Sequence, residues 1–141
     1  MATVSVTGHF CAAHSLSRYD GDCKQLHGHN FGVRIWAQGP VDSSTGMVED
    51  FKVLGRALRE VTDRYDHALI LNRESALYNW MVTAPEGILC DLKIIAFPTE
   101  PTCEELAVRI LNQLRSLLPN ELTVTRVEVT ETDKYSAIAN A

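Results

Sequence analysis

Residues 27–38 read HGHNFGVRIWAQ, and this stretch has the alternation of apolar and polar positions that is typical of a β-strand. Side chains two residues apart project from the same face of an extended strand. One face of this strand therefore carries both histidines together with apolar side chains: His27, His29, Phe31, Val33, Ile35 and Ala37. We expect the two imidazole rings to point in one direction, toward the sheltered side of a sheet.

Strand and helix patterns follow one another along the rest of the chain. Alternating or apolar runs predict further strands over residues 3–12, with a bulge at Gly8, and over residues 92–97, 122–131 and 135–139. Apolar residues at helical spacing predict helices over residues 50–65 and 102–118. The polar stretch 17–26 is expected to be a loop, and the segment after residue 73 is expected to hold a short helix over residues 76–81 and a turn at residues 85–87.

Two residues mark where the long helices begin. Asp50 is a suitable N-cap, and Thr102 followed by Glu105 has the spacing of a capping box. The main elements, in the order strand–strand–helix–helix–strand–strand, predict an α+β fold with a four-stranded antiparallel sheet and two helices on one face. The uncovered face and open edges of so small a sheet favour pairing with further copies, so we expect a homo-oligomer.

The composition is that of one soluble globular domain over residues 1–141, with 45% hydrophobic and 22% charged residues. The net charge of −5 argues against a nucleic-acid partner, which normally requires a basic patch. No apolar run is long enough to span a membrane and no secretory pattern is visible, so we expect no membrane contact and a cytoplasmic location. The cysteines form no CxxC pair, which favours reduced thiols, and we interpret Cys11, Cys90 and Cys103 as small buried residues.

His14, His27 and His29 are the candidate metal ligands. Three histidines with one water molecule are the ligand set of a catalytic zinc ion that keeps a coordination position open. Two other interpretations remain at this point. In the first, the three histidines are unrelated core or surface residues. In the second, Cys23 supplies a fourth ligand and closes a structural zinc site.

Other residues are candidates for acid–base chemistry and binding. Cys23 acts as a base or nucleophile if a nearby imidazole or metal lowers its pKa, and is otherwise an idle thiol. Asp66 precedes His67 directly, so its carboxylate can orient the ring, although helix C-termini favour histidine in any case. Glu131 ends an apolar strand face, either as an ordinary solvated carboxylate or as a buried anion that accepts two hydrogen bonds from a guanidine-like ring edge.

Taken together, these residues resemble a known family. The chain is similar to the 6-pyruvoyl-tetrahydropterin synthase / 6-carboxy-tetrahydropterin synthase family. The matching stretches follow the family order: FCAAH (10–14), CKQLHGHN (23–30), GMVEDF (46–51), DH (66–67), LN (71–72), PTCE (101–104) and ET (131–132). Each stretch is weak evidence alone, and the set is highly specific.

The resemblance implies the tunnelling (T) fold. In that family, subunits form trimers around a barrel and usually stack as a homohexamer, with sites between subunits. It also implies Zn²⁺ bound by the three histidines named above, with Cys23 as the catalytic thiol and Asp66 with His67 as the proton-transfer pair. Glu131 would anchor the pterin ring, with Thr102 beside it.

The Cys-x3-His-x-His spacing resembles the carboxy-tetrahydropterin synthases of queuosine biosynthesis, because the pyruvoyl enzymes of tetrahydrobiopterin synthesis typically have a longer gap. The implied substrate is 7,8-dihydroneopterin triphosphate, and the implied products are 6-carboxy-5,6,7,8-tetrahydropterin, acetaldehyde and triphosphate. A pyruvoyl product and a non-catalytic zinc-stabilised module remain as alternatives.

The chain departs from the compact carboxy-synthases in its long Arg73–Glu100 segment, and from some members in having Cys103 in place of a small hydroxyl residue. Arg18 and Lys24 are triphosphate candidates only as cations that flank Cys23.

Overall fold

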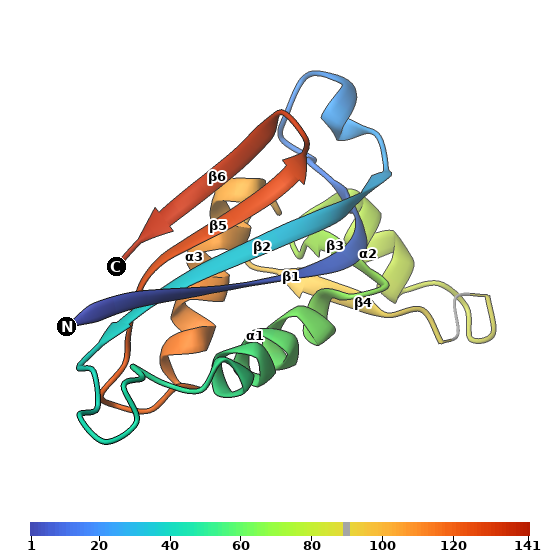
Figure 1. Cartoon of the computed structure of the whole chain (residues 1–141). Helices are drawn as coiled ribbons and strands as arrows, with labels where there is room; N and C mark the ends of the chain where they lie inside the picture. The colour runs from blue at the N-terminus through green and yellow to red at the C-terminus, as the bar shows by residue number, and fades with distance from the viewer. Residues whose placement is uncertain (89–90) are drawn as a thin grey trace.

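A twisted mixed sheet forms the centre of the molecule (Figure 1). The computed structural model describes residues 1–88 and 91–141, and within them the sheet has six strands in the order β4-β3-β1-β2-β5-β6. In chain order these are β1 (Ala2–Ser15), β2 (His27–Gly39), β3 (Ala68–Asn72), β4 (Ile94–Phe97), β5 (Thr123–Thr132) and β6 (Tyr135–Asn140). The four strands β1, β2, β5 and β6 pair in antiparallel fashion, whereas β3 and β4 extend the β1 edge in parallel.

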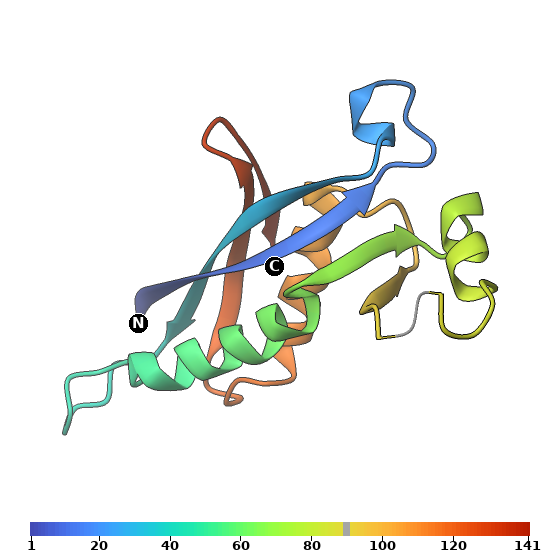
Figure 2. The ribbon, with the colours of Figure 1, turned by 90° about the vertical axis from the view of Figure 1, so that its right-hand side faces the viewer.

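Two long helices cover one face of this sheet and leave the other face uncovered (Figure 2). They are α1 (Phe51–Tyr65), which packs on β1, and α3 (Cys103–Arg115), which packs on β5 and β6. Both begin where the sequence predicts. The side chain of Asp50 accepts a hydrogen bond from the Lys52 amide at 2.8 Å, and that of Thr102 accepts one from the Glu105 amide at 3.3 Å. These caps satisfy amides that have no partner inside the helix.

Shorter elements complete the described chain. The short helix α2 (Ala76–Val82) lies beside the end of β3, as Figure 1 shows, and a single 3₁₀ turn, η1 (Asp22–Lys24), interrupts the loop between β1 and β2. Both the short helix and the turn at residues 85–87 confirm the sequence prediction. In the part of the chain that the structure describes, no helix combines the length and apolarity needed to cross a membrane.

The hydrophobic core lies between the covered face and the two long helices. Phe10 of β1 stacks on Phe31 of β2 with ring centroids 5.0 Å apart, and both are fully buried. Helix α1 contributes Leu54 and Leu58, and α3 contributes Ile110, to the same cluster. Truncation of such a residue to alanine typically costs about 2–5 kcal/mol of stability, so this core fixes the strands that carry the site.

The α+β T-fold prediction is confirmed, but the predicted four-stranded antiparallel sheet is too small. The sequence ALILN (68–72) forms β3, which was not predicted because a short continuous apolar run has no period that separates strand from helix. Parallel strands that are buried on both faces are typically such runs. β4 was expected as a short strand, and its parallel pairing with β3 makes the sheet mixed.

The bulge expected at Gly8 is also wrong. The β1–β2 register runs unbroken from Ala2 opposite Gly39 to His14 opposite His27. Gly8 instead lies against α1, where an added Cβ atom would come within 3.1 Å of a Leu58 methyl carbon. The missing side chain therefore permits close packing of helix on strand.

Candidate active site

The three predicted metal ligands meet at one end of the sheet. His14 stands near the end of β1, directly opposite His27 at the start of β2, and His29 lies two residues further along β2. One potential ligand atom from each ring lies within 4.8 Å of those of the other two. The rings lie on the helix-covered face, with His14 and His29 each edge-on to the core residue Phe31. This arrangement confirms that the three side chains converge, and we call them the histidine cluster.

Backbone carbonyl groups fix the orientation of two of the rings. Nδ1 of His14 lies 2.8 Å from the carbonyl oxygen of Pro101, and Nδ1 of His27 lies 2.6 Å from that of Gln25. A carbonyl oxygen only accepts hydrogen bonds, so both neutral rings carry their proton on Nδ1 and present a lone pair at Nε2. Metal-bound histidines usually have such a partner on the opposite ring nitrogen.

The lone pairs in the cluster face one another without a donor between them. The Nε2 atoms of His14 and His27 are only 3.1 Å apart. Nε2 of His29 is buried and has no hydrogen-bond partner within the described residues. Burial lowers the pKa of His14 and also that of His29, which favours the neutral form that binds metals. Converging nitrogen lone pairs without protons fit a bound cation.

A pocket of about 490 Å³ adjoins the cluster on the helix-covered side, and we call it the helix-side pocket. Cys23, Thr102 and Glu131 line it, as do residues of the β5–β6 turn. Oε1 of Glu131 lies 3.4 Å from Nε2 of His14 and 3.5 Å from Nε2 of His29. The volume is within the range of small-molecule sites, and a ligand in this pocket would lie next to the cluster.

The structure does not form the closed cage that Cys23 would complete. The ligand group within 4.8 Å contains the three histidines and not Cys23, whose side chain lines the helix-side pocket instead. Backbone contacts hold its loop against the end of β1: the Leu16 amide donates to the Cys23 carbonyl at 2.9 Å, and the Ser15 hydroxyl donates to the Lys24 carbonyl at 2.8 Å.

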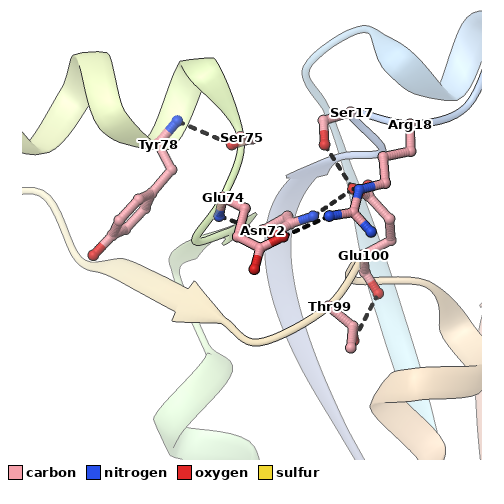
Figure 3. A network of polar contacts seen from close by, with 8 residues as sticks. All are labelled: Ser17, Arg18, Asn72, Glu74, Ser75, Tyr78, Thr99 and Glu100. Carbon is pink, nitrogen blue, oxygen red and sulfur yellow. Dashed lines mark hydrogen bonds and ion pairs between the residues drawn. The ribbon is translucent and has the colours of Figure 1, made fainter.

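A polar network that sequence reasoning missed ties this loop to the end of β3 through Glu100 (Figure 3). Oε1 of Glu100 accepts hydrogen bonds of 2.6 Å from both the Ser17 hydroxyl and the Asn72 amide. Burial raises the pKa of Glu100, but these hydrogen bonds outweigh burial and the pKa is lowered. Glu100 directly precedes Pro101, whose carbonyl holds His14, so one carboxylate joins the loop, the end of β3 and the residue that orients the His14 ring.

The same network engages one of the two cations proposed for the triphosphate. Nη2 of Arg18 lies 2.5 Å from Oε2 of Glu74, and its Nε lies 3.9 Å from Oε1 of Glu100. Arg18 is thus already paired with two carboxylates, whereas Lys24 is exposed in η1. The only signal for this network in the sequence is the family stretch that ends at Asn72.

Asp66 and His67 lie apart from Cys23. Asp66 caps the C-terminus of α1, and its Oδ2 accepts a hydrogen bond from Nδ1 of His67 at 2.7 Å. Its Oδ1 accepts from the Cys11 amide at 2.8 Å, and these two contacts lower the pKa of Asp66. The His67 side chain is 83% exposed and lines a second pocket, of about 530 Å³, together with Cys11 and Asn30.

This second pocket opens on the uncovered face of the sheet, and we call it the open-face pocket. Cys11 and Asn30 pair across the β1–β2 ladder and alternate with Phe10 and Phe31, which point into the core. The pocket also borders His29. The hydrogen bond shows that the Asp66 and His67 side chains are in direct contact, but the chain places them on the face opposite the thiol.

The cysteine expectations have mixed outcomes. Cys11 is exposed, not buried, because it occupies an outward position of β1. Cys103 is half-buried, its thiol lies 3.1 Å from the Val129 carbonyl, and burial raises its pKa to about 12, so it is an inert thiol. Cys90 lies outside the described residues.

Comparison with known proteins agrees with this architecture. The family model for 6-pyruvoyl tetrahydropterin synthase matches residues 3–141. A candidate 6-carboxy-5,6,7,8-tetrahydropterin synthase of Archaeoglobus fulgidus is 32% identical over 136 residues, covering 96% of this chain and 93% of its own length. A 6-carboxy-5,6,7,8-tetrahydropterin synthase of Haemophilus influenzae is 29% identical and covers 94% of each chain.

Solved structures show the same fold. The 6-pyruvoyl tetrahydropterin synthase of Plasmodium falciparum has a TM-score of 0.73 at 26% identity, over 99% of this chain and 97% of that one. An uncharacterised protein of Wolinella succinogenes has a TM-score of 0.84 at 21% identity, with the same coverage, which compares the fold alone. The chain therefore belongs to the 6-pyruvoyl tetrahydropterin synthase family.

Proposed function

We propose that the protein is a zinc-dependent lyase that converts 7,8-dihydroneopterin triphosphate and one water molecule to 6-carboxy-5,6,7,8-tetrahydropterin, acetaldehyde and triphosphate, a step of queuosine biosynthesis. The observation that carries this proposal is the position of Glu131, which lines one pocket with Cys23 and lies 3.4 Å from His14 and 3.5 Å from His29 of the histidine cluster. The names of the relatives from Archaeoglobus and Haemophilus support the carboxy product.

In this proposal His14, His27 and His29 hold the zinc ion, because their nitrogen lone pairs converge without donors. Bound zinc supplies Lewis-acid polarisation of the substrate's side-chain hydroxyl groups. Three protein ligands leave a position open for those hydroxyls, which a closed structural site would not. The cluster therefore supports an enzyme over a zinc-stabilised module.

Glu131 positions the pterin ring. Its carboxylate is about three-quarters buried, with 23% of the side chain exposed, and it faces the helix-side pocket with Thr102. A carboxylate can accept two parallel hydrogen bonds from the N–H groups of a guanidine-like ring edge, which fixes orientation as well as affinity. Held in this way, the ring places the substrate side chain next to the cluster, a proximity effect.

Cys23 removes a proton from the substrate side chain. Its thiol borders the same pocket as Glu131, and the contacts of its loop with β1 fix its position relative to His14. As a thiolate, Cys23 is a sufficiently strong base for a hydroxyl or carbon acid that is already polarised. The proton moves from the substrate to Sγ and leaves an electron pair that drives tautomerisation of the dihydropterin ring.

His67, oriented by Asp66, is the second acid or base, and a neighbouring copy of the chain supplies it. Within one subunit the pair is on the uncovered face, away from the helix-side pocket. β6 forms one edge of the sheet, which allows a further copy to pair there. We infer a cytoplasmic homohexamer made of two trimers, with its active sites between subunits.

The experiment that tests this function is a product assay. Purified, zinc-loaded protein is incubated with 7,8-dihydroneopterin triphosphate, and the products are identified by mass spectrometry. Carboxy-tetrahydropterin with acetaldehyde is the expected result. If the substrate is not consumed while zinc is bound, the proposed function is wrong.

A 6-pyruvoyl product is the second candidate. The family model and the Plasmodium falciparum structure carry that name. It requires the same zinc site and pocket but retains the side-chain carbons that the carboxy reaction releases as acetaldehyde. The same mass spectrum separates the two products.

A further inference from the structure

His67 has an unusual backbone conformation. Its φ angle is 55°, and in residues 1–88 and 91–141 only one other non-glycine residue, Asp91, has a positive φ. A residue with a Cβ atom rarely adopts this region, and such a conformation persists only where surrounding contacts hold it. The contacts around His67 therefore decide where its imidazole ring points.

Contacts with β1 account for part of this restraint. The His67 amide donates to the Cys11 carbonyl at 2.6 Å, and the Cys11 amide donates to Oδ1 of Asp66 at 2.8 Å. They attach both residues to the neighbouring strand. Neither contact reaches the carbonyl group of Asp66. This carbonyl lies in the same peptide plane as the His67 amide, so its orientation helps to set φ of His67.

Lys93 supplies the hydrogen bond to the Asp66 carbonyl that β1 does not. Its Nζ donates to the carbonyl oxygen of Asp66 at 2.9 Å and to that of Asp63 at 2.6 Å. Its own carbonyl accepts from the Leu69 amide at 2.9 Å, so the backbone of Lys93 is fixed beside β3. An ammonium group is also favourable at the C-terminus of α1, where the helix dipole is negative. Rotation of the peptide that joins Asp66 to His67 would break the bond from Nζ.

We propose that Lys93 is a positioning residue for the Asp66–His67 pair: its ammonium group locks the peptide plane that aims the His67 ring into the open-face pocket. Lys93 lines that pocket with His67. It stands where the long connection after Asn72 returns to the sheet, so this connection supports the proton-transfer pair. The inference rests on the proposed function only in assigning proton transfer to the pair.

The test begins with Lys93→Met, which keeps the length of the side chain and removes its donors. We expect kcat to fall about tenfold, the scale of a small misplacement of a catalytic group, while KM and zinc content stay unchanged. Lys93→Arg should restore most of the rate, because a guanidinium group can donate to two carbonyl groups. The double variant Lys93→Met/His67→Ala should be no slower than His67→Ala, because the effect of Lys93 passes through His67.

Arg64→Met is the matched control. Arg64 lies in the last turn of the same helix and pairs with Glu60 at 3.0 Å, whereas the hydrogen bonds of Asp66 within the described residues go to Cys11, His67, Lys93 and the helix backbone. Its loss removes a cation from the same helix end and should leave kcat unchanged. An equal fall in kcat would mean that Lys93 acts by stabilising the helix terminus, and would overturn the proposal.

A second measurement does not depend on activity. NMR spectra are recorded on protein labelled with ¹³C-histidine. The imidazole ring resonance of His67 is assigned as the one that disappears in His67→Ala. We expect this signal to shift or broaden in Lys93→Met and to stay unchanged in Arg64→Met. An unchanged signal, or a double variant in which the two losses multiply, would overturn the positioning role. If His67→Ala is fully active, the proposed role of the pair fails, and the NMR signal still decides whether Lys93 holds the ring.

Discussion

The helix-covered face of the sheet and its uncovered face hold their functional side chains in different ways. On the covered face His14 is fully buried and fixed by a core aromatic ring and a backbone carbonyl. On the uncovered face the His67 side chain is 83% exposed and depends on a neighbouring carboxylate and main-chain contacts. The difference shows that the chain encloses the histidine cluster and exposes the Asp66–His67 pair, which suits the proposal that this pair serves a neighbouring copy.

The largest expected effect tests whether the covered face alone holds the metal. His14→Ala should lose bound zinc and all turnover, because even the hydrogen-bond partners of metal ligands contribute about 10–100-fold to affinity. Zinc content by mass spectrometry and product formation measure this. His9→Ala is the control, because His9 is exposed and points to the other face of the same strand. A full equivalent of zinc in His14→Ala would contradict the assigned ligand set.

The next effect tests whether the two faces combine between subunits. Cys23→Ala and His67→Ala should each lower kcat by about 10²–10⁴-fold, the usual contribution of a positioned acid or base, with zinc retained. If each site takes Cys23 from one copy and His67 from another, mixed oligomers prepared from equal amounts should recover about one quarter of the wild-type sites. The rate of the co-refolded mixture measures the recovery. Mixed oligomers as inactive as the separate variants would exclude a shared site.

A smaller effect is expected at the boundary between the pocket and the histidine cluster. Glu131→Gln should weaken pterin affinity by about 10–100-fold, since hydrogen bonds to a charged group contribute about 1.5–3 kcal/mol. Fluorescence titration with a pterin measures it, and Glu104→Gln, an exposed carboxylate of the same pocket, is the control. Because Glu131 lies within 3.5 Å of two histidine nitrogens, a loss of zinc would reassign it as a metal ligand.

The smallest effect separates folding from binding. Asp50→Ala and Thr102→Ala each remove a helix N-cap and should each lower stability by about 1 kcal/mol, seen in urea denaturation. Thr102 also lines the helix-side pocket, whereas Asp50 does not. Only Thr102→Ala should therefore raise KM. An unchanged KM in that variant would restrict Thr102 to capping α3.

The structural features that could be predicted from the sequence are those set by residues close to one another in the sequence. Alternation in residues 27–38 identified β2 and placed His27 and His29 on one face, and local capping signals located the start of both long helices. Contacts between distant residues gave no local signal. The Pro101 carbonyl that holds His14 is 87 residues away in sequence, and the pairing of Glu100 with Ser17 spans 83. The separation of Cys23 from His67 also depends on the parallel strand β3, which periodicity could not identify.

The unbroken ladder between β1 and β2 also affects how the protein folds. Because His14 stands opposite His27, a slip of one residue would turn one strand's histidines to the other face and disperse the ligands. The metal ion proposed for these three rings would therefore stabilise the native pairing and none of its slipped alternatives. With the proposed metal site, metal uptake during folding would thus favour the correct register of the two longest strands.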